Sequence, residues 1–178
     1  TVWLNPSKDP YDNFDKLTAI HQNLGLKAMF FFQFAAYSEH DKNISIHRNK
    51  FRYLIKSVAD YGIVSLSASM ASSKDLAVLK KEKSDLSNLI NRPVKYSRLR
   101  YNRVAMPQTY RNLVEAEFTD DFTMGYTHHL GFRAGTCTPF YFYDINLEVQ
   151  QPIKVHPFVA CDYSFTKYKK PNEVYEAL

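Results

Sequence analysis

Apolar runs of strand length alternate with helical segments at least three times along this chain. The run from Lys27 to Tyr37 is continuous, and a shorter one spans Ile63 to Ser69. Between such runs, apolar residues recur at three- and four-residue spacing, which is typical of helices with one buried face. Parallel strands are joined by connections of helix length, so this alternation predicts an α/β fold with parallel strands. A barrel and a doubly wound sheet both satisfy it.

The segment ends carry helix-start and helix-stop signals. Asp9-Pro10 supplies a cap and a first-turn proline, and Gly25 ends the same helix. We expect helices over residues 9–24, 50–61, 72–91 and 107–118, strands over 27–37, 63–69, 94–100 and 140–149, and a tail or short helix from Pro171. In α/β folds, ligands bind at the carboxyl ends of strands. The candidate positions are therefore residues 35–37, 67–73, 98–101 and 121–126, together with His156.

Composition restricts the class of protein. The chain has 178 residues, of which 45% are hydrophobic, so we expect one globular domain over residues 1–178. The net charge of +5 comes from scattered lysines rather than a long basic run, which disfavours nucleic-acid binding. No apolar run approaches the roughly 20 residues that span a bilayer, so we expect no membrane span. Aromatic side chains reach 15%, which fits either core filling or a surface on which sugars stack.

The chain has two cysteines, Cys137 and Cys161, which are too few for a disulfide framework and lack metal-ligand spacing. One structural disulfide and two free thiols are both open interpretations, and free thiols are favoured. Free thiols are typical of a reducing compartment, and the opening TVWLNPSKDP does not resemble a signal peptide. We therefore expect a cytoplasmic protein.

The segment from Thr119 to Asp144 concentrates reactive side chains and has little helical periodicity. Asp121, Tyr126 and Arg133 are costly to bury, so we expect them near a surface or a cleft. A long surface loop followed by an aromatic-rich strand is the plainer interpretation. A functional loop at the mouth of the scaffold is the other.

Serines and histidines elsewhere give weaker indications of catalysis. The stretch Ser67–Ser73 is rich in hydroxyls but lacks the G-x-S-x-G elbow of a serine hydrolase, and helix capping by Ser72 or Ser73 explains it better. Adjacent His128 and His129 would point to opposite faces of a strand, so an exposed polar loop is favoured over a metal site. His156 ends an apolar strand, where an imidazole can act as a general acid or base.

Seven stretches carry a resemblance: DPYDNFDKL, FFFQFAAYSEHDKNIS, LSASMASSKDLAVLKKEKSDL, PQTYRNL, DDFTMGY, GFRAGTCTPFYFYD and IKVHPFVACD. They resemble the polysaccharide deacetylase superfamily (NodB-like, carbohydrate esterase family 4), in particular a branch of hypothetical proteins from Bacteroidetes bacteria. The resemblance extends over residues 9–168. It implies a deformed (β/α) barrel whose first, aspartate-bearing strand would lie upstream of Thr1.

In that superfamily a divalent metal, often zinc, polarises the acetamide carbonyl and activates water. The resemblance implies that Arg98 is the orienting arginine, Asp121 the acid that supports it and His156 the histidine acid. The branch reads G-[IL]-H-P-S and S-R-Q-H where this chain has Ser67 and Arg100 in place of the two histidines. No metal ligand is recognisable, so we expect zinc binding and acetyl removal to be impaired.

The resemblance implies a polysaccharide or oligosaccharide partner. The first hypothesis is a deacetylase-like protein whose metal-dependent removal of acetyl groups is impaired or lost. The alternative is a non-catalytic relative that binds a glycan or a protein partner in the former active-site cleft, and a third is a structural part of a larger protein. The expected substrate-binding residues are Ser67, Arg100, Tyr126 and Arg133, with Tyr101 beside them. A cleft lined in this way is positive and favours acidic sugars or other anions.

Overall fold

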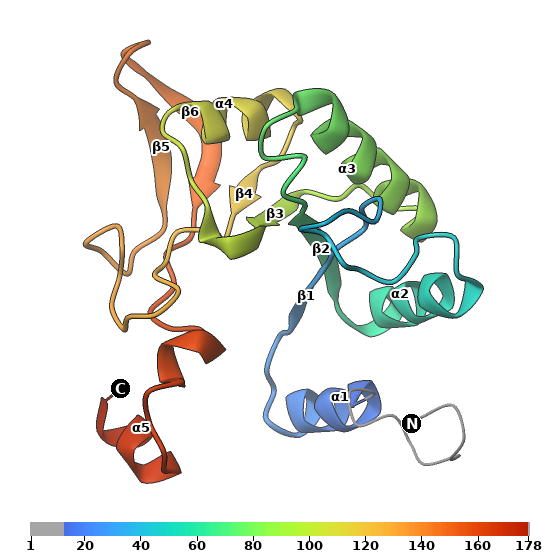
Figure 1. Cartoon of the computed structure of the whole chain (residues 1–178), viewed down its shortest axis with the longest axis vertical. Helices are drawn as coiled ribbons and strands as arrows, with labels where there is room; N and C mark the ends of the chain where they lie inside the picture. Colours follow the sequence, from blue (N-terminus) through green and yellow to red (C-terminus); the bar gives the residue numbers. More distant parts are fainter. Residues whose placement is uncertain (1–12, 178) are drawn as a thin grey trace.

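The computed structural model describes residues 13–177, which form a sheet with helices packed along it (Figure 1). Its elements in chain order are α1 (Phe14–Asn23), β1 (Met29–Phe32), α2 (Asn49–Tyr61), β2 (Ile63–Ala68), α3 (Leu76–Ile90), β3 (Tyr96–Leu99), η1 (Arg100–Asn102), α4 (Gln108–Glu115), β4 (Asp120–Asp121), β5 (Phe140–Asp144), β6 (Val149–Val155), η2 (Asp162–Phe165) and α5 (Pro171–Ala177). The helix start expected at Asp9-Pro10 lies outside the described residues. Within them, no helix has the length and apolar character that a membrane span requires.

The strand order in the sheet is β1-β2-β3-β4-β6-β5. Neighbouring strands from β1 to β6 run parallel, as the alternating pattern predicts, and β5 pairs antiparallel with β6. Residues 140–149, expected as one strand, are β5 and the turn that leads into β6. The α/β class is confirmed. A closed barrel is not found within residues 13–177, where β1 and β5 form the two edges of the sheet.

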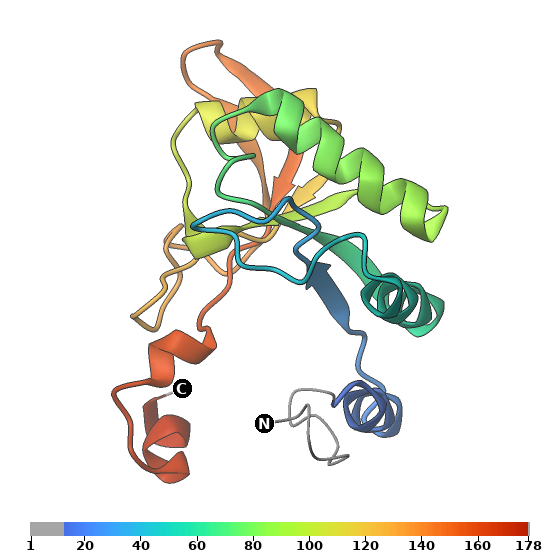
Figure 2. The ribbon, with the colours of Figure 1, turned by 45° about the vertical axis from the view of Figure 1, so that its right-hand side comes forward.

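One face of the sheet is buried by α2, α3 and α4. Side chains alternate along a strand, so Leu66, Leu99 and Val155 all point to this face, and none is more than 5% exposed. Leu86 of α3 and Leu113 of α4 pack into the same cluster. In Figure 2, α2 and α3 lie side by side along this layer. The apolar faces that the helical periodicity predicts are thus buried against the strands of the sheet.

The opposite face of the sheet is lined by aromatic rings. Phe31 on β1, Tyr96 on β3 and Phe122 just after β4 define what we call the aromatic face. The ring centroid of Phe122 lies 5.6 Å from that of Phe31 and 6.1 Å from that of Tyr96. Ser65, which pairs with Phe31, has a fully buried hydroxyl with no hydrogen-bond partner among the described residues. The rings therefore shield this part of the face from water.

A loop leaves the sheet directly after β1, so the strand expected over residues 27–37 is much shorter. Asp41, which is 1% exposed, holds this loop. Its carboxylate accepts hydrogen bonds from Gln33 Nε2 (2.7 Å), Ser38 Oγ (3.2 Å) and the backbone N–H of Met70 (3.1 Å). These contacts tie the loop after β1 to the carboxyl end of β2.

The expected helix cap at Ser72 or Ser73 is wrong. Helix α3 begins after Asp75, whose carboxylate accepts hydrogen bonds from the backbone N–H groups of Ala77 and Val78. The two serine hydroxyls instead donate to carbonyls three residues earlier, within the turn that precedes the helix.

Candidate functional site

Four side chains form a row across the aromatic face near the carboxyl ends of the parallel strands. Ser67 pairs directly with Arg98. The backbone N–H of Phe122 donates to Ser97, and that of His156 donates to Asp121, so the parallel ladder continues from β3 through β4 to β6. Arg98, Phe122 and His156 therefore follow one another on the same side of the sheet. We call these four residues the Ser67–His156 row.

His156 is held in place from two directions. Its Nε2 atom lies 2.7 Å from Oδ1 of Asp120, and both side chains are partly buried. The imidazole also stacks on Phe122, with ring centroids 4.4 Å apart and planes 11° from parallel. A carboxylate bound to one ring nitrogen fixes the orientation of the imidazole. The Asp120–His156 pair can thus hold or transfer a proton beside the row.

Asp121 does not lie where the sequence places it. The expectation of a surface or cleft position is wrong, because Asp121 is fully buried on the helix-covered side of the sheet. Its carboxylate accepts hydrogen bonds from Ser97 Oγ (3.1 Å), Thr123 Oγ1 (2.6 Å) and Tyr110 OH (3.4 Å). Burial raises the pKa of Asp121 to about 6, although the hydrogen bonds from Thr123 and Ser97 oppose that rise. Adjacent residues of a strand point to opposite faces, so Asp120 takes the position beside His156.

Arg98 rests on a ring supported by a glycine. Its guanidinium carbon lies 4.7 Å from the centroid of Phe158. A Cβ atom added to Gly125 would lie only 2.2 Å from Cζ of Phe158. The Phe158 ring therefore lies directly against the Gly125 backbone. The absence of a side chain at residue 125 positions the platform on which the Arg98 guanidinium rests.

A cavity of about 390 Å³ opens at the carboxyl ends of β2 and β3. Residues that line it include Ser67, Arg98, Arg100, Tyr101, Asp162 and Tyr163. Arg100 donates through Nη1 to Gln33 Oε1 (2.5 Å) and through Nη2 to the hydroxyl of Tyr101 (3.3 Å). The nearest oxygen of Asp41 is 3.7 Å from Nη1 of Arg100. Tyr101 has a left-handed φ of 58°, a conformation that non-glycine residues seldom adopt outside constrained sites.

The remaining predicted site residues lie on the loop between β4 and β5. Tyr126 is 41% exposed and meets His129 edge to face, with centroids 6.2 Å apart. Arg133 is also exposed and donates from Nη1 to the backbone oxygen of Asn102 (3.0 Å). Neither residue lines the cavity, in contrast to Ser67 and Arg100. The structure thus brings together only part of the predicted set.

Both cysteines are free thiols, which resolves the alternative left open by the sequence. Cys137 is exposed, and Cys161 lines the cavity. The Cys161 thiol donates to the backbone oxygen of Thr127 (3.2 Å), which joins the segment after β6 to the loop after β4.

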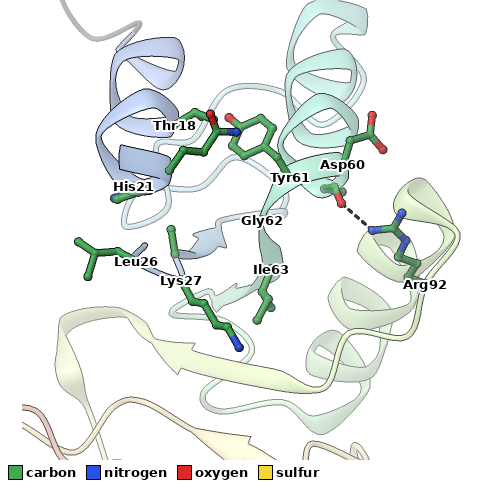
Figure 3. Close-up of a pocket in the computed structure, with 12 residues that line it drawn as sticks. Thr18, His21, Leu26, Lys27, Asp60, Tyr61, Gly62, Ile63 and Arg92 are labelled. Atoms are coloured by element: carbon green, nitrogen blue, oxygen red, sulfur yellow. Dashed lines mark hydrogen bonds between the residues drawn. The ribbon is translucent and has the colours of Figure 1, made fainter. Parts of the chain in front are cut away.

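A second cavity, of about 320 Å³, lies at the amino ends of β1 and β2, between α1 and α2 (Figure 3). Thr18 and His21 of α1, Tyr61 of α2 and Lys27 before β1 are among the residues that line it. Arg92 at its edge donates to the backbone oxygen of Ala59. Ligands of α/β sheets bind at the opposite ends of the strands. The described residues also place no acid–imidazole pair here, so we assign the site to the Ser67–His156 row.

No family model and no curated protein matches this sequence significantly. Solved structures do match. A protein assigned as a polysaccharide deacetylase from Mycobacterium smegmatis aligns over 94% of this chain and 57% of its own, with a TM-score of 0.60 and 15% identity. IcaB from Ammonifex degensii covers 65% of this chain and 56% of its own (TM-score 0.46, 14% identity). The polysaccharide deacetylase Bc1974 from Bacillus cereus covers 66% and 57% (TM-score 0.45, 18% identity).

The chain is therefore an α/β protein whose arrangement of sheet and helices is similar to that of the Mycobacterium smegmatis structure. More specifically, it has a polysaccharide deacetylase-like fold over most of its length. It spans little more than half the length of the Mycobacterium smegmatis protein.

The residues of this fold do not suit the divalent metal that the resemblance implies. No group of three or more histidine, cysteine, aspartate or glutamate side chains within residues 13–177 is placed to hold a metal ion. The cavity lining does include His128, Cys161 and Asp162, but these three are not placed to hold one ion, and Arg98 and Arg100 beside them offer only cationic donors. A positive guanidinium repels a second cation, so the side chains of residues 13–177 at this cavity do not fit the divalent metal that the resemblance implies.

Sequence reasoning missed Asp120, Phe122 and Gly125. The adjacent acids Asp120 and Asp121 indicate that one faces each side of a strand, but β4 is only two residues long and does not reveal which. The order of polar and apolar residues around the two acids also does not show which acid faces the helices. Gly125 carries no sequence signal for its close contact with a ring 33 residues later.

Proposed function

We propose that this chain is a polysaccharide deacetylase-like bacterial protein that binds a polysaccharide or oligosaccharide across the Ser67–His156 row. The observation that carries the proposal is the 2.7 Å pair of Asp120 and His156 on the same face as Arg98, within a deacetylase-like fold. An aromatic surface with a few converging polar groups is a suitable ligand-binding surface. Sugar rings can stack on Phe122 while their hydroxyls bond to Arg98 and the imidazole. The two free thiols support the accompanying proposal of a reducing, cytoplasmic location.

In this proposal, metal-dependent acetyl removal is impaired or lost. The hydroxyl of Ser67 is a poor ligand for zinc, and the Arg100 guanidinium occupies the cavity wall that a cation would approach. The protein would then keep glycan recognition without efficient hydrolysis.

The Asp120–His156 pair favours one second function, which is retained hydrolysis of the bound glycan. An oriented imidazole is a competent general acid for a leaving group. This second function requires acetate release, and the first does not, so a single set of assays separates them.

Replacing His156 by glutamine is expected to weaken binding of an acetylated oligosaccharide by about tenfold, because it removes a stacked, hydrogen-bonding ring worth roughly 1–1.5 kcal/mol. Isothermal titration calorimetry with chitin and hyaluronan oligosaccharides measures the loss. Asp120→Asn should cause a smaller loss, since the ring remains while its anchoring carboxylate is removed. His47→Gln is the matched control, because His47 is exposed and does not line the cavity.

The same samples are incubated with zinc, and free acetate is measured. The proposal predicts binding without acetate release. Zinc-dependent release that His156→Gln abolishes would show that hydrolysis is retained. If no oligosaccharide binds the wild-type protein, the glycan proposal is wrong.

A further inference from the structure

We infer that the cavity at the ends of β2 and β3 binds an oxyanion substituent of the glycan, a carboxylate or a sulfate, through Arg98 and Arg100. The inference rests on the proposed function and specifies its substrate class as an acidic glycan. Its starting point is the 390 Å³ cavity, which lies within the size range of small-ligand sites.

Arg98 is the principal cation of this cavity. Its guanidinium makes no hydrogen bond and no ion pair with any residue from 13 to 177, and the aromatic ring that it contacts is that of Phe158. Stacking on a ring occupies the flat face of a guanidinium and leaves its N–H groups free at the edge. Those donors form a planar fork that matches the two oxygens of a carboxylate or sulfate. A partly buried arginine in this state is suited to an anion supplied by a ligand.

Arg100 adds a second, rigid cation. Gln33 and the Tyr101 hydroxyl each accept a hydrogen bond from its guanidinium, which fixes its direction. The nearest acid, Asp41, is 3.7 Å away and already accepts hydrogen bonds from Gln33, Ser38 and the Met70 backbone. Asp41 therefore only partly neutralises Arg100.

The rest of the lining suits an acidic sugar. Asp162 is the one acidic residue of the lining, and it is exposed. Ser67 of β2 adds a neutral hydroxyl to the lining, and Tyr101 and Tyr163 add aromatic surface. Arg98 belongs to both the cavity and the Ser67–His156 row. A sugar ring over Phe122 can thus extend an acidic substituent into the cavity without a change of fold.

The test compares a hyaluronan hexasaccharide with its carboxyl-reduced, neutral form by isothermal titration calorimetry. Arg98→Gln is expected to weaken binding of the acidic form by about tenfold or more, which is the size expected for a charge-assisted hydrogen-bonded pair. Binding of the neutral form should be weaker in the wild type, and Arg98→Gln should weaken it much less than it weakens binding of the acidic form, because only hydroxyl contacts are then lost. Arg100→Gln is a second variant with the same expected direction. Arg103→Gln is the charge-matched control, because its side chain lines a different hollow.

A chondroitin sulfate hexasaccharide of equal length is titrated in the same way. A larger loss of its affinity than of hyaluronan affinity in Arg98→Gln identifies the sulfate as the bound oxyanion, and an equal loss identifies the carboxylate. If both variants bind acidic and neutral forms as the wild type does, while His156→Gln still weakens them, the cavity inference is overturned and the glycan proposal stands. If no form binds the wild-type protein, both are overturned. Thermal unfolding of each variant confirms that it is folded, which we expect for Arg98→Gln because no described residue depends on that guanidinium for a hydrogen bond.

Discussion

The free energy of unfolding of the wild-type protein is expected to fall as pH rises from about 4 to about 6. Replacing Asp121 by asparagine is expected to abolish most of this fall, because asparagine does not titrate. Burial raises the pKa of this carboxyl from 3.8 to about 6 in the folded chain, so the folded state favours the protonated form. A raised folded pKa adds stability below the unfolded pKa, and that stability is lost as pH rises through the folded pKa. At roughly 1.4 kcal/mol for each pKa unit, the loss is about 3 kcal/mol.

The measurement is the free energy of unfolding by urea at a series of pH values for wild type and Asp121→Asn. A shallower slope remains in the variant, because burial also raises the pKa of Glu82. Asp85→Asn is a surface control, since Asp85 forms only an exposed pair with Lys81. If the free energy of unfolding changes with pH equally in wild type and Asp121→Asn, the folded protein does not raise the pKa of Asp121 and the prediction is wrong.

Replacing Gly125 by alanine is expected to lower the free energy of unfolding by about 1–3 kcal/mol, the usual cost of overpacking a filled site. The new methyl group would lie within 2.4 Å of three atoms of the Phe158 ring, so the ring must move. Because Arg98 rests on that ring, its guanidinium loses its platform as well. Urea unfolding measures the first effect, and binding of an acidic oligosaccharide measures the second.

A double-mutant cycle with Phe158→Ala tests the cause. In the Phe158→Ala background the space beside residue 125 is empty, so Gly125→Ala should cost much less than in the wild type. Additive effects of the two substitutions would show that the clash with Phe158 is not the source of the destabilisation.

The fold was predictable where one local pattern decided the outcome. The apolar run Ile63–Ala68 follows Gly62, is buried at Val64, Ser65 and Leu66 in succession, and forms β2 as expected. The helical stripe after Lys50 ends at Tyr61, close to the predicted boundary. Both elements bury their apolar residues against each other, so sequence period and tertiary packing agree.

Other features depended on contacts between distant residues. The strand after Lys27 is short because Asp41 draws the following loop toward Met70, 29 residues later. The antiparallel pairing of β5 with β6 follows from a turn at residues 145–148 that the aromatic run conceals. In the site, Arg98 and His156 could be named from their strand-end positions. Asp120 could not, because the side that each acid faces is set by pairing with β3 and β6.

The central claim is that a glycan binds the Ser67–His156 row rather than the cavity between α1 and α2. Carbon-detected or carbon-edited NMR of the aromatic side chains, during titration with a hyaluronan hexasaccharide, tests it most directly. We expect chemical-shift changes at the rings of Phe122, His156 and Tyr96, with the rings of His21 and Tyr61 unchanged. Shifts confined to His21 and Tyr61 would contradict it and would move the binding site to the amino ends of β1 and β2.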